Sequence, residues 1–134
     1  MKTLKNLTKE PLLLLNTLVE GIGGIAMVLT PNLIKNWGSV EIAPALIQTC
    51  GLLALSVAFY SYLGAEYIGK SKDPTLIRSL LYASLAVFHS AITIGLFYAV
   101  VQGEINYFGV ILHLPLAVLF IVSWFMLAKS KAAQ

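Results

Sequence analysis

Three ionisable residues lie inside stretches of sequence that are otherwise apolar. Glu20 falls within residues 12–29, His89 within residues 79–101 and His113 within residues 107–127. Ionisable side chains in hydrocarbon are costly unless they face partners or water, so they indicate a functional site by default. A carboxylate beside imidazoles can hold or pass a proton, or can bind a metal ion.

Asn16 and Gln48 extend this polar set. Depth is counted from the end of each run that faces away from the cytoplasm in the topology predicted below, which we call the outer end. A helix rises about 1.5 Å per residue, so Glu20 lies about 14 Å, His89 about 18 Å, His113 about 9 Å and Gln48 about 6 Å from that end. We therefore predict a shared polar pocket in the outer half, with Asn16 one turn from Glu20. The alternative is a purely structural role, in which each of these side chains only forms a hydrogen bond with a neighbouring helix. Glu20 should reach at least one of Gln48, His89 and His113, directly or through one water.

The sequence predicts no metal site, because Glu20 and the histidines match no HExxH or similar spacing. Two histidines could ligate a haem only at one level, and the estimated depths of His89 and His113 differ by about 9 Å. The cofactor therefore stays unknown. Cys50 is the single cysteine, and we expect it to be a small buried residue.

Four apolar runs must position these residues. They comprise residues 12–29, 44–63, 79–101 and 107–127. Each run has about 18–23 residues, enough for a helix that crosses about 30 Å of hydrocarbon. The chain is 58% hydrophobic and 11% charged, whereas a soluble domain is about 25% charged. We predict an all-α integral membrane bundle, a single domain over residues 1–134, with an uncleaved first span.

The positive charges predict the topology. Eight of the nine basic residues fall before the first run, between the second and third, or after the fourth: Lys2, Lys5, Lys9, Lys70, Lys72, Arg78, Lys129 and Lys131. Only Lys35 falls on the other side. Positive residues stay on the cytoplasmic side, so we expect an up-down-up-down bundle in the cytoplasmic membrane with both termini cytoplasmic. The pI near 9.1 then comes from basic residues at the membrane surface, which we expect to contact lipid headgroups and not nucleic acid.

Small residues recur at helical spacing within the runs. One stripe contains Gly51, Ala54, Ala58 and Ser61, and Gly23 and Gly24 share a stripe with Asn16 and Glu20. Small residues at such spacing let helices approach closely. We therefore predict that Ala54 and Ala58 face another helix and not lipid.

The chain resembles the DoxX-like group of small bacterial four-span proteins. The resemblance lies in the segments LTPNLIKNWG, CGLLALSVAFY and DPTLIRSLLYASLAVFH. It implies a four-helix bundle in the cytoplasmic membrane, and some members are linked to thiosulfate or quinone oxidation. The chain is also similar to the sterol-isomerase and sigma-2 type four-span proteins. Their usual pair of acids is absent here, since Glu20 is the only acid within a run.

Three functions fit these observations. The first is a protein that holds a small hydrophobic ligand or a partner subunit at the polar pocket, through Asn16, Glu20, Gln48, His89 and His113. The second is a membrane enzyme or redox subunit that exchanges protons with a quinone- or sterol-like substrate. The third is a structural membrane subunit, in a homo-oligomer or with a partner, whose polar residues only join helices.

Overall fold

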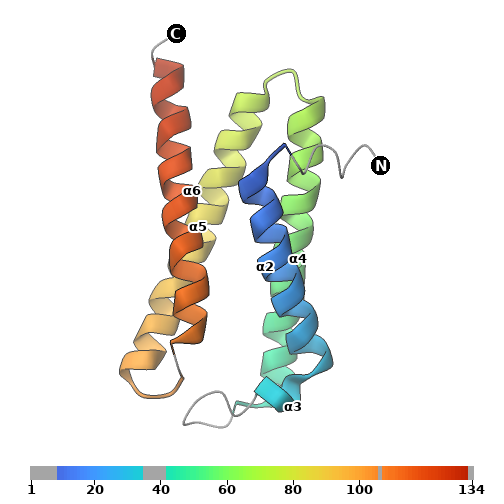
Figure 1. The fold of residues 1–134 in the computed structure, drawn as a ribbon, viewed down its shortest axis with the longest axis vertical. Coiled ribbons are helices and arrows are strands. Elements are labelled where there is room, and N and C mark those ends of the chain that lie inside the picture. The colour runs from blue at the N-terminus through green and yellow to red at the C-terminus, as the bar shows by residue number, and fades with distance from the viewer. Residues whose placement is uncertain (1–8, 35–41, 106, 133–134) are drawn as a thin grey trace.

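The computed structural model describes residues 9–34, 42–105 and 107–132. Their helices are α2 (Pro11–Leu29), α3 (Pro31–Ile34), α4 (Pro44–Lys70), α5 (Pro74–Val101) and α6 (Phe108–Ala132), and no strand occurs among these residues. The four long helices run alongside one another (Figure 1), with α3 at one end of the bundle and the α4–α5 connection at the other. We call these the α3 end and the opposite end.

All four long helices are long and apolar enough to cross a membrane, which confirms the predicted all-helical, multi-pass character. Pro11, Pro44 and Pro74 each begin a helix, where a missing N–H is tolerated. The Asp73 carboxylate caps α5 by accepting a hydrogen bond from the Leu76 N–H at 2.8 Å.

Helices α4 and α5 are longer than the apolar runs from which they were predicted. α4 continues to Lys70 and α5 already begins at Pro74, whereas the runs stop at residue 63 and resume at residue 79. Hydropathy marks only the stretch that suits hydrocarbon, and the backbone hydrogen bonds of a helix continue through polar residues.

The helices associate as two pairs, α2 with α4 and α5 with α6, and contacts between the pairs are sparser. α2 and α4 approach each other closely where Gly24 faces Gly51: a Cβ atom on Gly24 would lie 2.8 Å from the Gly51 carbonyl oxygen. Ala54 and Ala58 are each 6% exposed, and the Thr17 hydroxyl on α2 lies 3.5 Å from the Ala58 carbonyl oxygen. The prediction that these alanines face another helix is confirmed.

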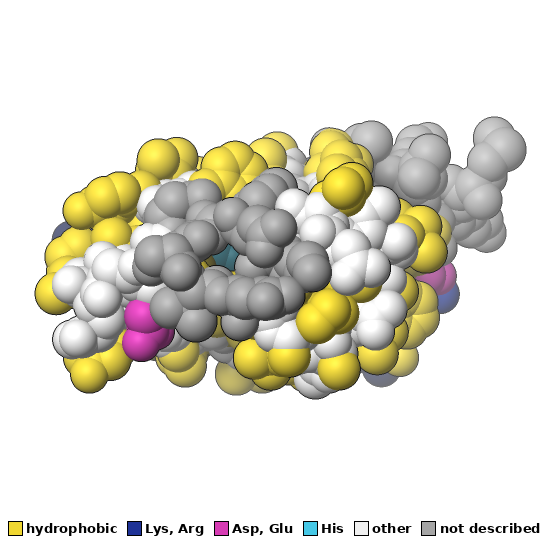
Figure 2. All heavy atoms as spheres, turned by 90° about the horizontal axis from the view of Figure 1, so that it is seen from below, with side chains coloured by type: hydrophobic (Ala, Val, Ile, Leu, Met, Phe, Trp, Pro, Cys, Tyr) yellow, Lys and Arg dark blue, Asp and Glu magenta, His cyan; other side chains and the backbone are white. Residues whose placement is uncertain are grey.

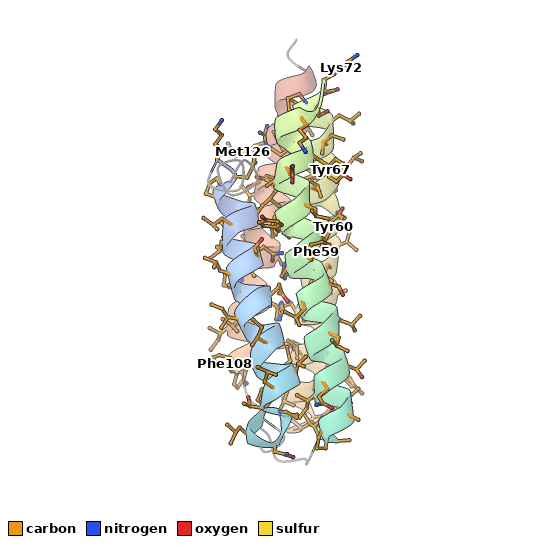
Figure 3. All side chains as sticks on the ribbon, turned by 90° about the vertical axis from the view of Figure 1, so that its right-hand side faces the viewer. Phe59, Tyr60, Tyr67, Lys72, Phe108 and Met126 are labelled. Atoms are coloured by element: carbon orange, nitrogen blue, oxygen red, sulfur yellow. The ribbon has the colours of Figure 1, made fainter. Side chains whose placement is uncertain are left out.

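The buried apolar core lies where the two pairs meet, and includes Leu13, Leu85 and Phe120. Outward-facing positions are also largely apolar. Phe59 and Tyr67 on α4, labelled in Figure 3, are 61% and 66% exposed. An apolar exterior around a small apolar core is what a bilayer environment requires, because lipid-facing positions need no polar side chains.

Candidate functional site

Glu20, His89 and His113 converge from α2, α5 and α6. The Oε1 atom of Glu20 lies 3.5 Å from Nδ1 of His113 and 3.8 Å from Nδ1 of His89. The two Nδ1 atoms are 3.1 Å apart. The prediction that Glu20 reaches a histidine is therefore confirmed, and the two histidines also contact each other.

Asn16 and Ser61 connect this cluster to α4. The Asn16 side chain donates from Nδ2 to the Ser61 hydroxyl at 2.8 Å, and its Oδ1 lies 2.6 Å from Nε2 of His89. Asn16, Ser61 and His89 are all 0% exposed. Each of the four long helices thus contributes a side chain to one polar network in the centre of the bundle.

These bonds determine where His89 carries its hydrogen. The Asn16 Oδ1 atom can only accept, so Nε2 of His89 is the donor. In a neutral imidazole the other nitrogen then has a lone pair, and Nδ1 of His89 is the atom that faces Glu20 and His113. The close Nδ1–Nδ1 contact is satisfied either by a hydrogen on His113 or by a cation shared between two lone pairs.

Aromatic rings hold the His89 imidazole in place. The Phe120 ring stacks on it with an interplanar angle of 2° and a centroid distance of 5.6 Å, and Phe88 meets it edge-on at 5.0 Å. A side chain clamped between rings and hydrogen-bonded through Nε2 loses little further entropy when it binds something through Nδ1.

Glu20 has one unsatisfied oxygen. Within the part of the chain that the structure describes, Glu20 Oε1 is the buried side-chain atom that lacks a hydrogen-bond partner. Buried polar atoms are nearly always partnered, and an exception calls for an explanation such as an absent water, ion or ligand. The orphan atom is the one that points between the two histidines.

A cavity of about 370 Å³ leads to this cluster. Glu20 and His113 lie on its wall together with Met27, Ile47 and Leu96, and it extends towards the α3 end past Ile34, Ile42 and Phe108. Figure 2 views the bundle from that end, where part of a histidine side chain is visible from outside near the middle of the face. His89 does not line the cavity, so the cluster has one histidine on the cavity wall and one behind it.

Two predictions about polar residues on α4 are wrong. Gln48 is exposed, and its amide donates to the Val28 carbonyl at 3.2 Å instead of joining the cluster. Cys50 is exposed and not buried, and it also lines the cavity. Both residues lie on α4 away from the buried face that contains Gly51, Ala54 and Ala58. Consecutive residues of a helix are turned by about 100°, so residues next in sequence to a buried position face another side of the helix.

The estimated depths of the histidines were also wrong. Counting from the end of each run separated His89 and His113 by about 9 Å along the membrane normal, yet their rings lie side by side with centroids 5.3 Å apart. The count assumes that all runs start at one level and stand upright, and neither holds for packed helices. The direct contact leaves no space for a haem between the imidazoles.

A second buried polar group lies at the opposite end and was not predicted. Arg78 on α5 donates to Glu10 from Nε at 3.0 Å and from Nη2 at 2.6 Å. The Tyr82 hydroxyl donates to the same carboxylate at 3.2 Å. Glu10 is 5% exposed and precedes α2, so this bidentate pair ties the start of α2 to α5. Nothing in the local sequence pairs residues 68 positions apart.

Comparison of the chain with protein-family models, with curated proteins and with solved structures gives no match. The resemblance to the DoxX-like group therefore stays a prediction.

The arrangement allows three kinds of chemistry. The carboxylate and two imidazoles can share a proton. They can hydrogen-bond the polar group of a molecule in the cavity. They can also hold a metal ion, since each offers one ligand atom and these atoms lie within 4.8 Å of one another. The site thus combines an apolar cavity with a polar end that has unused binding capacity.

Proposed function

We propose that the protein holds a small, mostly hydrophobic molecule with one polar group in the cavity between its two helix pairs. Binding sites for small molecules are typically concave, mostly apolar and about 300–1,000 Å³ in volume, with a few convergent polar groups. The cavity of about 370 Å³ has the Glu20 carboxyl and the His113 imidazole among lining residues that are otherwise mostly apolar. The observation that carries the proposal is the orphan Oε1 atom of Glu20, a residue on the wall of that cavity.

The polar group of such a molecule would be a hydroxyl, a carbonyl or a similar neutral group. The Glu20 carboxylate can accept a hydrogen bond from such a group, and the His113 imidazole can donate one to it. A neutral ligand group also avoids the cost of moving a further charge into the bundle. The apolar part would lie against Met27, Ile47 and Leu96. The DoxX-like resemblance points to a quinone-like molecule, which has carbonyl groups on an apolar body.

Ligand retention tests the proposal through two matched glycines. A Cβ atom on Gly23 or on Gly95 would have nothing within 4 Å, but only Gly23 lines the cavity. We expect Gly23→Phe to fill the cavity and Gly95→Phe to leave it open. Mass spectrometry of organic extracts from purified protein should then find a copurified molecule in the wild type and in Gly95→Phe, but not in Gly23→Phe.

Both variants should elute as the wild type does on gel filtration, because the Cβ atom added at either position has nothing within 4 Å. Equal extracts from all three proteins, or an extract that contains only bulk phospholipid in the wild type, would contradict ligand binding. The phospholipid content of the extracts is the internal standard for this comparison.

We further propose that the four helices cross the cytoplasmic membrane in alternating directions, with both termini and the α4–α5 connection in the cytoplasm. The eight-to-one distribution of basic residues supports this orientation. The ligand cavity would then open towards the outer face, since it extends to the α3 end.

Cysteine labelling tests the orientation. In a Cys50→Ala background, which removes the single native thiol, a membrane-impermeant maleimide added to intact cells should label Glu104→Cys and spare Ser71→Cys. Glu104 lies in the link between α5 and α6, and Ser71 in the turn between α4 and α5. Labelling of both after cell lysis is the control. Labelling of Ser71→Cys alone in intact cells would reverse the proposed orientation.

A further inference from the structure

We infer that Glu20, His89 and His113 form a site for a divalent transition metal of the zinc class. The inference goes beyond the proposed ligand and does not require the cavity to be filled. It starts from three side chains on three different helices, which is why no sequence spacing indicated it.

The distances between the three ligand atoms match a metal site. Zinc binds histidine nitrogen and carboxylate oxygen at about 2.0–2.2 Å, so ligand atoms in tetrahedral positions lie about 3.4 Å apart. The three separations here are 3.1 Å between the two Nδ1 atoms, and 3.5 and 3.8 Å from these atoms to Glu20 Oε1. Shifts of a few tenths of an ångström would bring all three atoms around one ion.

The proton arrangement of His89 favours a metal at the same point. Histidines that bind metals nearly always donate their other ring N–H to an acceptor, which fixes the tautomer and the ring orientation. Asn16 Oδ1 accepts from Nε2 of His89 at 2.6 Å and leaves the Nδ1 lone pair facing the cluster. Ser61 in turn fixes Asn16 through its 2.8 Å hydrogen bond.

The charge balance of the cluster also calls for a cation. Among the side chains that the structure describes, no lysine or arginine forms an ion pair with Glu20, and the Glu20 Oε1 atom is buried without a hydrogen-bond partner. A divalent ion would satisfy that oxygen and both imidazole lone pairs at once. Two histidines and one carboxylate are a ligand set used by zinc and by non-haem iron, with a coordination position left open.

The open position would face the cavity, because Glu20 and His113 line it and His89 lies behind them. A molecule in the cavity could bind the ion through its polar group. The ion alone would use the same position for water.

Zinc binding by the purified full-length protein tests the site. After removal of metals with a chelator and dialysis against Zn²⁺, we expect one zinc per chain by elemental analysis. We expect His89→Gln and His113→Gln to weaken zinc binding at least about tenfold. Glu66→Gln, an acid on α4 outside the cluster, is the matched control and should bind as the wild type does. Co²⁺ in place of Zn²⁺ should give the strong visible absorption of a four-coordinate site in the wild type and in Glu66→Gln, but not in the two histidine variants.

Two variants separate this inference from the proposed ligand. Gly23→Phe should lose the cavity ligand and keep zinc, whereas His89→Gln should lose zinc and keep an open cavity. If His89→Gln does not fold, the partly exposed His113→Gln still gives the answer. Zinc that stays far below one per chain, or that binds equally to the wild type and both histidine variants, would overturn the metal site whatever the ligand experiment shows.

Discussion

Substitution of Gly24 by leucine is expected to separate α2 from α4 and to abolish the folded bundle in detergent. Even the first added carbon is too close to its neighbours. It would lie 2.8 Å from the Gly51 carbonyl oxygen, 2.8 Å from Leu55 Cγ and 3.0 Å from the Leu55 backbone nitrogen. Two of these three atoms belong to the backbone of α4, so no side-chain rotation relieves the contact.

The alanine variant gives a graded version of this result. Overpacking typically costs about 1–3 kcal/mol, while replacement of glycine within a helix returns up to about 1 kcal/mol. Gly24→Ala should therefore lower the midpoint temperature of thermal unfolding. The midpoint is the temperature at which half of the heated protein still elutes as a monodisperse peak on gel filtration. Gly23→Ala is the control on the same helix, because its Cβ meets nothing within 4 Å. If Gly24→Ala is as stable as Gly23→Ala, the close approach at Gly51 is not needed for stability.

Arg78→Leu is expected to destabilise the protein by about 3–5 kcal/mol, because it leaves a buried carboxylate without its partner. Glu10 is 5% exposed and receives two hydrogen bonds from Arg78. In the variant only the Tyr82 hydroxyl would remain bonded to it. Titration with a denaturing detergent, followed by circular dichroism, measures the change in free energy of unfolding.

An exposed ion pair provides the matched control. Lys70 is bonded to Glu66 on α4 and its side chain is 66% exposed, so Lys70→Leu should change stability by less than about 1 kcal/mol. The double variant Glu10→Leu with Arg78→Leu should regain most of the loss, since replacing both members of a buried pair by apolar residues is often neutral. A loss in Arg78→Leu no larger than that in Lys70→Leu would show that water solvates Glu10 and that the pair adds little.

Much of the fold could be predicted from the sequence because hydrocarbon constrains it so strongly. Apolar length revealed the four spanning helices, and the prolines at positions 11, 44 and 74 marked where three of them begin. The burial of Ala54 and Ala58 followed from their spacing. The ends of α4 and α5 were less predictable, because the polar residues at a membrane surface do not indicate whether the helix continues.

The candidate site was predictable in its members and not in its geometry. The cost of burying an ionisable group required partners for Glu20, and the two histidines were the main candidates within the runs. Their direct contact depends on how far each helix is shifted along its neighbour, which composition does not record. Gln48 found a backbone carbonyl on the adjacent helix instead. The pairing of Glu10 with Arg78 was missed because Arg78 was counted only as a positive charge that sets orientation.

The division of the bundle into two helix pairs has a thermodynamic consequence for whatever occupies the site. Asn16 and Glu20 belong to the α2–α4 pair, and both histidines belong to the α5–α6 pair. The site is therefore split across the sparser interface between the two helix pairs, and it exists only while the two pairs are packed together.

By linkage, an occupant that binds only the packed form strengthens this interface according to its own concentration. At 100 times its dissociation constant it contributes about 2.7 kcal/mol. The free energy that holds the two pairs together therefore rises with occupancy, in addition to the contribution of the apolar core between them. The stability that the bundle gains when the occupant is added therefore reports how full the site is.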